Sequence, residues 1–316
     1  MVHRSNLTKI VIIATVALII LLNLYTFVIA YPETYTINAG INTSGTPLAK
    51  DFSAYYMGAW RLWNNPAHIY NFGALNDGEP TILPHPEEYK YLPSFLLIVS
   101  PLLALNYQQA LLTFDIIQFM LLPLMGYILY KLLENKHIAV ALVVMIIALI
   151  MPFPTLNQGL SLSYYWQWGE GQAKVFLTFL LLLSFYFGNR GKPYLSGIAL
   201  AFGFFDPRFG LLALPLFIMY NRKNFKAATI SLIGSLALSN AMLLYPGMAS
   251  NFLSMVFASA ITTPIYYYAL IPFFTLLALI IVNFKELVAT FDRKGTYANF
   301  TGSPKPQESR QNTTKS

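Results

Sequence analysis

Long apolar runs separated by short polar connections occupy most of this chain and constrain its fold more than any other feature. Only 10% of its 316 residues are charged, against about 25% in a typical soluble domain. A run of about 20 apolar residues can cross a bilayer as a helix. The sequence therefore predicts an all-α, polytopic membrane protein with about eight transmembrane helices. The predicted spans are residues 10–30, 110–131, 138–153, 173–189, 194–205, 208–220, 226–245 and 264–284.

The first run, residues 10–30, could also be the apolar part of a cleaved signal peptide, because Arg4 and Lys9 precede it. It is longer than the roughly 7–15 residues of such a segment and no clear cleavage site follows, so we expect an anchor. The tail, residues 301–316, is polar and is predicted to be disordered in the cytoplasm. We therefore expect one transmembrane domain over residues 1–300, with a first outer loop over residues 31–109.

The segment 92–105 is apolar but only about 14 residues long, which is typical of a re-entrant or interfacial segment. The positive-inside rule also favours a topology in which this segment does not cross the membrane. If this segment does not cross and the N-terminus is cytoplasmic, 15 of the 20 Lys and Arg residues lie inside, and the C-terminus is cytoplasmic too. Retention of Lys and Arg on the cytoplasmic side explains the net charge of +7, so no nucleic-acid partner is expected. The basic residues left outside are Lys50, Arg61, Lys90, Lys174 and Arg208.

The first outer loop contains an amphipathic pattern that begins at Asp51. Apolar residues recur at 52, 55, 56, 59, 60 and 63, the spacing of one helical face. The predicted helix is rich in Tyr and Trp, ends at Asn64-Asn65-Pro66, and is expected to lie at the membrane interface. Asp51 directly precedes it, at an N-cap position. Asp51 could therefore be a cap, a general base that accepts a proton from an acceptor hydroxyl, or both.

Other outer residues carry several interpretations. His68 and His85 could bind a metal with the loop acids, but no ligand spacing such as HExxH occurs, so no metal is predicted. Trp166 and Trp168 could stack on a sugar or belong to an aromatic belt at the interface. Asp115 lies inside a predicted span, where a bare carboxylate is expensive. We expect it to have a partner or to contact water.

Two cations stand at the outer ends of predicted spans. Lys174 begins the span 173–189, and Arg208 follows Asp206-Pro207 at the break between two short spans. Both cations could hold a lipid-linked phosphate, since ammonium and guanidinium groups bind phosphate oxygens. Alternatively, Lys174 extends along the bilayer to reach water, and Arg208 pairs with Asp206.

Four segments occur in an order that is similar to that of a known family. They are DFSAYYMGAWRLWNNPAHIYNF, KYLPSFLLIVSPLLAL, GEGQAKVFLTFLLLLSFYF and GIALAFGFFDPRFGLLALPLFIMYNRK. Together they resemble the polyprenol-phosphate-dependent mannosyltransferases of glycosyltransferase family 87, which belong to the multi-span GT-C class. The likeness covers roughly residues 10–236.

The resemblance implies roles for particular residues. The family's presumed catalytic base, an Asp that opens the first outer loop, corresponds to Asp51. Tyr91-Leu92-Pro93 corresponds to a Tyr-Pro-Pro element with one proline missing, and Gly171-Gln172-Ala173-Lys174 to a Gly-Gln-x-Asn element with Lys in place of Asn. Asp206-Pro207 stands where a Lys-Pro pair is common. The candidate substrate-binding residues are Tyr55, Tyr56, His85, Tyr91, Trp166, Gln172, Lys174, Asp206 and Arg208.

The implied activity is transfer of a hexose, with mannose as the expected sugar, from a polyprenyl-phosphate donor to a glycan or glycolipid acceptor. It is expected at the outer face of the bilayer, with inversion and without a cofactor. Two alternatives stay open. A transporter could use Asp115 and the broken hairpin 194–220 as a midplane site. A noncatalytic GT-C-like subunit is also compatible with the changed Asp206-Pro207 position.

Overall fold

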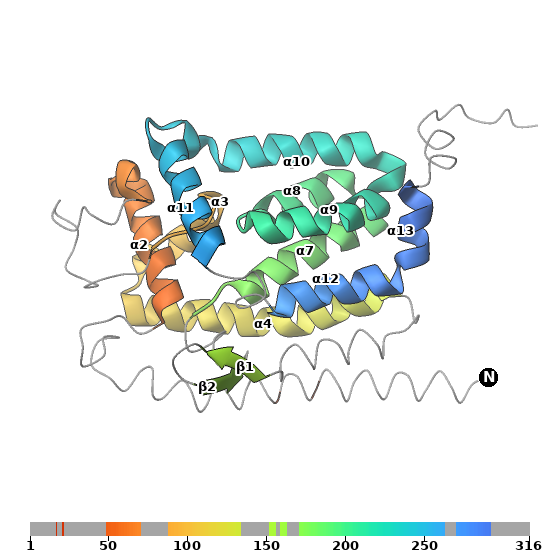
Figure 1. Cartoon of the computed structure of the whole chain (residues 1–316), viewed down its shortest axis with the longest axis horizontal. Coiled ribbons are helices and arrows are strands. Elements are labelled where there is room, and N and C mark those ends of the chain that lie inside the picture. Colours follow the sequence, from red (N-terminus) through yellow and green to blue (C-terminus); the bar gives the residue numbers. More distant parts are fainter. Residues whose placement is uncertain are drawn as a thin grey trace, which may run out of the picture.

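The computed structural model describes residues 49–70, 88–133, 152–155, 159–162, 171–262 and 270–291, with the single residues 17 and 21 (Figure 1). Within these ranges the chain is helical apart from one small sheet, so the all-α prediction is confirmed with that exception. The first elements are α2 (Lys50–Asn64), the 3-10 helix η2 (Pro66–His68), α3 (Ser94–Val99), η4 (Ser100–Ala104) and α4 (Tyr107–Leu133). The middle elements are β1 (Pro152–Thr155), β2 (Gly159–Leu162), α7 (Lys174–Asn189), α8 (Pro193–Gly203) and α9 (Pro207–Asn221). The last are η5 (Arg222–Asn224), α10 (Phe225–Ser239), η6 (Ala241–Leu244), α11 (Met248–Thr262), α12 (Leu270–Val282) and α13 (Phe284–Phe291).

α4 is the described helix best suited to cross a membrane. Its 27 residues extend over about 40 Å and confirm the helix predicted over 110–131. Within the described ranges, α4 alone is long and apolar enough to cross a membrane. A second such span is present if the bent pair Pro272–Val282 and Phe284–Phe291 forms a single crossing. The count of eight crossings stays a prediction, because the run 10–30 and most of 138–153 lie outside the described residues.

The last two residues of the run 138–153, the only ones that the structure describes, lie in a strand. β1 pairs antiparallel with β2, with Pro152 opposite Leu162 and Thr155 opposite Gly159. Pro152 and Pro154 lack a backbone N–H and cannot continue a helix. The span predicted here is therefore wrong over its last two residues, which belong to the hairpin.

α7, α8 and α9 follow the predicted runs closely, and α8 packs between α7 and α10. Gly197 of α8 allows the backbones to approach. A Cβ there would lie 2.5 Å from the carbonyl oxygen of Ala228 and 2.6 Å from the nitrogen of Leu232. On the α7 side, the hydroxyls of Ser184 and Ser196 each donate to the other residue's carbonyl oxygen at 2.9 Å. These contacts fix α8 against α7 and α10.

The C-terminal helices differ from the predicted runs. The run 226–245 stops being α-helical after Ser239, where Asn240 accepts a hydrogen bond of 3.0 Å from the backbone N–H of Ser94. Within the run 264–284, the described residues Leu270–Val282 form α12, and the chain then bends by 75° into α13. α11 occupies a segment for which no helix was predicted.

α2 is confirmed as a helix, but it belongs to the core. Most of its side chains from Phe52 to Leu62 are buried. The ring of Phe52 lies 4.9 Å from that of Phe114 in α4, and the ring of Tyr55 lies 5.0 Å from that of Phe95 in α3. α3 and α4 both pack against the helix, so other helices cover most of it, and its expected place at the membrane interface stays a prediction.

α3 and η4 together form an apolar segment of about 16 Å, about half the thickness of the hydrocarbon core. This length supports the predicted re-entrant or interfacial segment. The N-terminal end of the segment is held by two hydrogen bonds, one to Asn240 and one from the N–H of Leu92 to the carbonyl of Phe205, 2.9 Å long. The second bond connects the segment to the break between α8 and α9.

Candidate functional site

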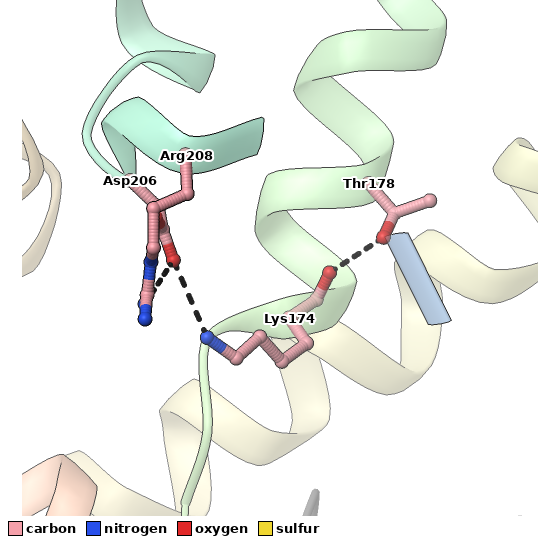
Figure 2. A network of polar contacts seen from close by, with 4 residues as sticks. All are labelled: Lys174, Thr178, Asp206 and Arg208. Carbon is pink, nitrogen blue, oxygen red and sulfur yellow. Dashed lines mark hydrogen bonds and ion pairs between the residues drawn. The ribbon is translucent and has the colours of Figure 1, made fainter. Parts of the chain in front are cut away.

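Three charged side chains meet where α7 begins and where α8 gives way to α9 (Figure 2). Arg208 donates two hydrogen bonds to the carboxylate of Asp206, from Nε to Oδ1 and from Nη2 to Oδ2, each 2.8 Å long. The ammonium of Lys174 lies 3.5 Å from the same Oδ2. The pairing of Arg208 with Asp206 is therefore present. Lys174 joins the pair and does not extend to water. We call Lys174, Asp206 and Arg208 the cationic trio, because two of the three charges are positive.

The local sequence explains this arrangement. Pro207 occupies the first turn of α9, where its missing N–H costs nothing, and Asp206 precedes it in an extended conformation. The side chain of Asp206 makes no capping bond to α9, so its carboxylate is available to the two cations. Lys174 begins α7 shortly after Gly171, whose φ of +66° suits glycine.

Burial makes the charges of the trio depend on one another. The side chains of Lys174 and Asp206 are 6% and 1% exposed, whereas that of Arg208 is 33% exposed. Burial alone raises the pKa of the Asp206 carboxyl, but the charges of Lys174 and Arg208 outweigh burial and lower that pKa below its usual value. The trio therefore has a net positive charge, and Arg208 is the member that solvent can reach.

Aromatic rings surround the buried ammonium. Nζ of Lys174 lies 5.5 Å from the ring centre of Tyr91 and 5.9 Å from that of Phe209, within the range of cation–π attraction. The ring of Tyr91 also meets those of Phe205 and Tyr55, with centroids 5.7 Å away in each case. Tyr91 therefore connects α2 with the cationic trio.

Asp51 lies in the first turn of α2 and not at its N-cap, so the capping interpretation is wrong. The cap is Ala49, in a left-handed conformation with φ 54° and ψ 64°. The Tyr107 hydroxyl donates to the carbonyl oxygen of Ala49 at 3.2 Å and holds this residue in place. Because Asp51 still lies at a helix N-terminus, the partial positive charge there stabilises its ionised form. The side chain is partly exposed.

The turn before α7 packs against the first turn of α2. A Cβ on Gly171 would lie 2.7 Å from the Cβ of Phe52 and 3.2 Å from that of Ala49, so only glycine fits. This contact brings Asp51 close enough for its charge to act on Lys174. The candidate base and the cationic trio therefore lie at the same end of α2 and α7.

Tyr55 lies one helical turn after Asp51, and its ring is buried. Its hydroxyl is also buried and meets no described group with full hydrogen-bond geometry, although the side chain of Tyr91 and the backbone of Ala173 lie close to it. Burial, followed by the neighbouring Tyr91 and Asp51, raises the pKa of this phenol well above its usual value. The group is thus a protonated donor, and leaving such a donor unpaired costs about 1–3 kcal/mol. A ligand oxygen could take up this donor.

The other predicted site residues have varied positions. The Tyr56 hydroxyl donates to the carbonyl oxygen of Leu105 at 2.8 Å, which ties α2 to the end of η4. Gln172 is buried in the turn before Lys174. His85 and Trp166 lie outside the described residues. The predicted residues that the structure brings together are Asp51, Tyr55, Tyr91, Gln172, Lys174, Asp206 and Arg208.

Two tyrosines that hold the Tyr91 segment were missed by the sequence interpretation. The Tyr70 hydroxyl donates to the carbonyl of Tyr91 at 2.8 Å, and the Tyr89 hydroxyl donates to that of Leu92 at 2.6 Å. Both side chains are buried. The signal for Tyr89 was its two-residue spacing from Tyr91, which places both rings on one side of an extended segment. Nothing comparable marks Tyr70.

Asp115 and the histidines were also candidates. Asp115 is 1% exposed and buried in α4, where its Oδ1 has no hydrogen-bond partner among the described residues. Its carboxylate is therefore shielded from bulk solvent. Among the described residues, no three His, Asp or Glu side chains form a group that could hold a metal ion.

Comparison with known proteins identifies one family. The family model described as glycosyltransferase family 87 matches residues 89–283. No curated protein matches the chain, and no solved structure does. The matched region contains Tyr91 and the whole cationic trio, whereas Asp51 lies before it.

Proposed function

This chain belongs to glycosyltransferase family 87, and from that premise we propose that it transfers a hexose, with mannose as the expected sugar, from a polyprenyl phosphate to a glycan or glycolipid acceptor. Family membership makes it a glycosyltransferase and a membrane protein. The observation that carries the more specific proposal is the position of Asp51 and the cationic trio at the same end of α2 and α7.

In this proposal Arg208 binds the phosphate of the donor. It is the exposed member of the trio, and Asp206 uses only part of its N–H groups. Lys174 adds a second positive charge from behind, and Asp206 holds both cations in position. When the bond between the sugar and the phosphate breaks, the departing polyprenyl phosphate gains negative charge. The two fixed cations stabilise that charge in the transition state.

Asp51 acts as the general base. The acceptor oxygen forms a bond to the anomeric carbon while the bond from that carbon to the phosphate oxygen breaks. The acceptor proton goes to Asp51, and the polyprenyl phosphate leaves with the electron pair. Direct displacement of this kind inverts the configuration at the sugar carbon. The protein holds the reactants in line and supplies the base, and the scheme requires no cofactor.

Tyr55 positions a substrate oxygen beside the base. Residues four apart in a helix lie on the same face, so the hydroxyl of Tyr55 and the carboxylate of Asp51 are both presented by one side of α2. The buried phenol can donate the hydrogen bond that it does not make within the described part of the chain.

The distribution of basic residues supports an outer position for this site. The trio lies at the first residue of α7 and at the start of α9. The opposite ends of α7 and α9 lead into turns with five exposed basic residues. They are Arg190, Lys192, Arg222, Lys223 and Lys226. The positive-inside rule assigns those turns to the cytoplasm and the candidate site to the outer side.

A transfer assay on membranes that contain the full chain tests the proposal. Polyprenyl phosphates carrying labelled mannose, glucose or galactose are supplied in turn, and a labelled nucleotide sugar is the comparison donor. We expect label in glycolipid or glycan from the mannosyl lipid, and an inverted anomeric configuration by NMR. Direct transfer from the nucleotide sugar, or retained configuration, would contradict the proposal.

The two hydrogen bonds between Arg208 and Asp206 favour one other candidate function, that of a noncatalytic member of the family. Asp206 occupies the side of the Arg208 guanidinium that a phosphate would take with two hydrogen bonds. The remaining N–H groups of Arg208 could still hold a donor phosphate with single hydrogen bonds, so a protein of this kind would bind a donor without transferring its sugar. A ligand that binds the native state raises the melting temperature. A raised Tm with polyprenyl-phosphate mannose, but without transfer of any sugar, would identify this candidate.

A further inference from the structure

The end of the helix bundle opposite the candidate site is strongly basic. The turn between α7 and α8 exposes Arg190 and Lys192, the turn between α9 and α10 exposes Arg222 and Lys223, and the first turn of α10 exposes Lys226. Neither turn contains an acidic residue. This end of the molecule therefore presents a concentrated positive charge that the glycosyl transfer does not use.

α13 lies across this same end. The chain bends by 75° between α12 and α13, and Figure 1 shows α13 running at a steep angle to α10 and α12 beside the ends of α8 and α9. Asn283 fixes the bend, since its side-chain amide donates to the carbonyl of Leu279 at 2.9 Å and to the hydroxyl of Tyr220 in α9 at 3.3 Å.

α13 has an apolar face that the described part of the chain does not cover. Phe284, Val288 and Phe291 follow helical spacing and are 59%, 52% and 51% exposed. Leu287 packs against the core, whereas Lys285 and Glu286 are exposed charged residues. A short helix with one apolar and one charged face can lie in the plane of a membrane interface.

We infer that α13 and the two basic turns form a docking surface for anionic phospholipid headgroups. The apolar face of α13 enters the boundary between headgroups and acyl chains, and the five basic side chains contact lipid phosphates around it. Three observations favour lipid over a protein partner. The chain is a membrane protein, α13 leaves α12 at the steep angle that an in-plane helix needs, and the charge complements an anionic leaflet. The inference rests on membrane embedding and is independent of the chemistry at Asp51.

Site-directed spin labelling of the full chain tests the position of α13. The sequence contains no cysteine, so Val288→Cys and Glu286→Cys each give one label, on opposite faces of the helix. In nanodiscs, the ratio of collisions with oxygen to collisions with a water-soluble nickel complex should be several-fold higher for the label at 288. Equal ratios at the two positions, or a label at 288 shielded from both reagents, would overturn the inference.

A second measurement tests the headgroup preference. Spin-labelled phosphatidylglycerol and phosphatidylcholine give the relative association constant of the two lipids with the reconstituted protein. We expect a preference for phosphatidylglycerol that falls by at least about fivefold for each basic residue reversed, as in Arg222→Glu and Lys223→Glu. Lys90→Glu, an exposed lysine beside the candidate site, is the matched control and should leave the preference unchanged. Equal association of the two lipids with the wild-type protein, or an equal effect of Lys90→Glu, would overturn the inference.

Discussion

The carboxylate of Asp206 and the guanidinium of Arg208 face each other with both N–O distances at 2.8 Å, although only one residue separates them in the sequence. Asp206 also lies 3.5 Å from the buried ammonium of Lys174. One carboxylate thus orders two cations from different helices. The predictions below follow from this arrangement and from the helix packing that supports it.

Asp206→Asn should destabilise the protein in a pH-dependent manner. Removing one partner of a buried ion pair leaves Lys174 uncompensated, which costs about 3–5 kcal/mol. The pKa of Asp206 is lower in the folded than in the unfolded chain. Its contribution is therefore full above the unfolded pKa of about 4 and is lost as pH falls through the folded pKa.

Thermal unfolding in detergent over a pH series measures this effect. The free energy difference between wild type and variant should be largest near neutral pH and should shrink below about pH 4. Equal melting temperatures at neutral pH would show that the trio does not stabilise the fold.

Arg208→Ala should weaken binding of the donor more than binding of the acceptor. A hydrogen bond to a charged group contributes about 1.5–3 kcal/mol, so KM for the lipid-phosphate sugar should rise by about 10- to 150-fold. Lys90→Ala removes an exposed cation on the same side and serves as the control. An unchanged donor KM in Arg208→Ala, with unfolding behaviour near that of the wild type, would exclude Arg208 as the phosphate ligand.

Tyr55→Phe should lower activity without lowering stability. The hydroxyl has no partner among the described residues, so its removal should leave the melting temperature equal or higher, while the substrate oxygen loses a donor. Tyr220→Phe is the matched control, because that phenol contacts Asn283 at the far end of the molecule. Loss of stability with full activity in Tyr55→Phe would assign the hydroxyl a structural role only.

Gly197→Ala should destabilise the helix packing beneath the site. The new Cβ would collide with backbone atoms of Ala228 and Leu232 at 2.5 and 2.6 Å, and overpacking of this kind costs about 1–3 kcal/mol. Gly234→Ala provides the control, since a Cβ there meets nothing within 4 Å. Melting temperatures should fall for the first variant and stay constant or rise for the second; equal shifts would contradict the packing described.

The runs with uninterrupted apolar character were predicted well from the sequence, and α4, α7, α8 and α9 confirm them. Predictions were wrong where side chains and backbone outside a run decide the outcome. Ala49 caps α2, and its carbonyl oxygen also accepts from the Tyr107 hydroxyl. Asn240 interrupts the run 226–245, and its side chain accepts from the backbone N–H of Ser94. Neither hydrogen bond can be predicted from the hydrophobic pattern of the sequence.

The candidate site was predicted only in part for the same reason. Asp206 and Arg208 are close in sequence, so their pairing could be anticipated. The addition of Lys174 depends on how α7 packs against α9, and the proximity of Asp51 depends on the close fit of Gly171 against Phe52. Such contacts join segments far apart in the chain, and one sequence carries no direct signal for them.

The most direct test of the central claim is the rate of sugar transfer by Asp51→Asn, measured at saturating polyprenyl-phosphate mannose. Loss of a general base should lower kcat by about 10²- to 10⁴-fold while donor binding persists, and Glu88→Gln, at a partly exposed acid in the segment before Tyr91, should behave as wild type. Transfer by Asp51→Asn at the wild-type rate would contradict the assignment of Asp51 as the base.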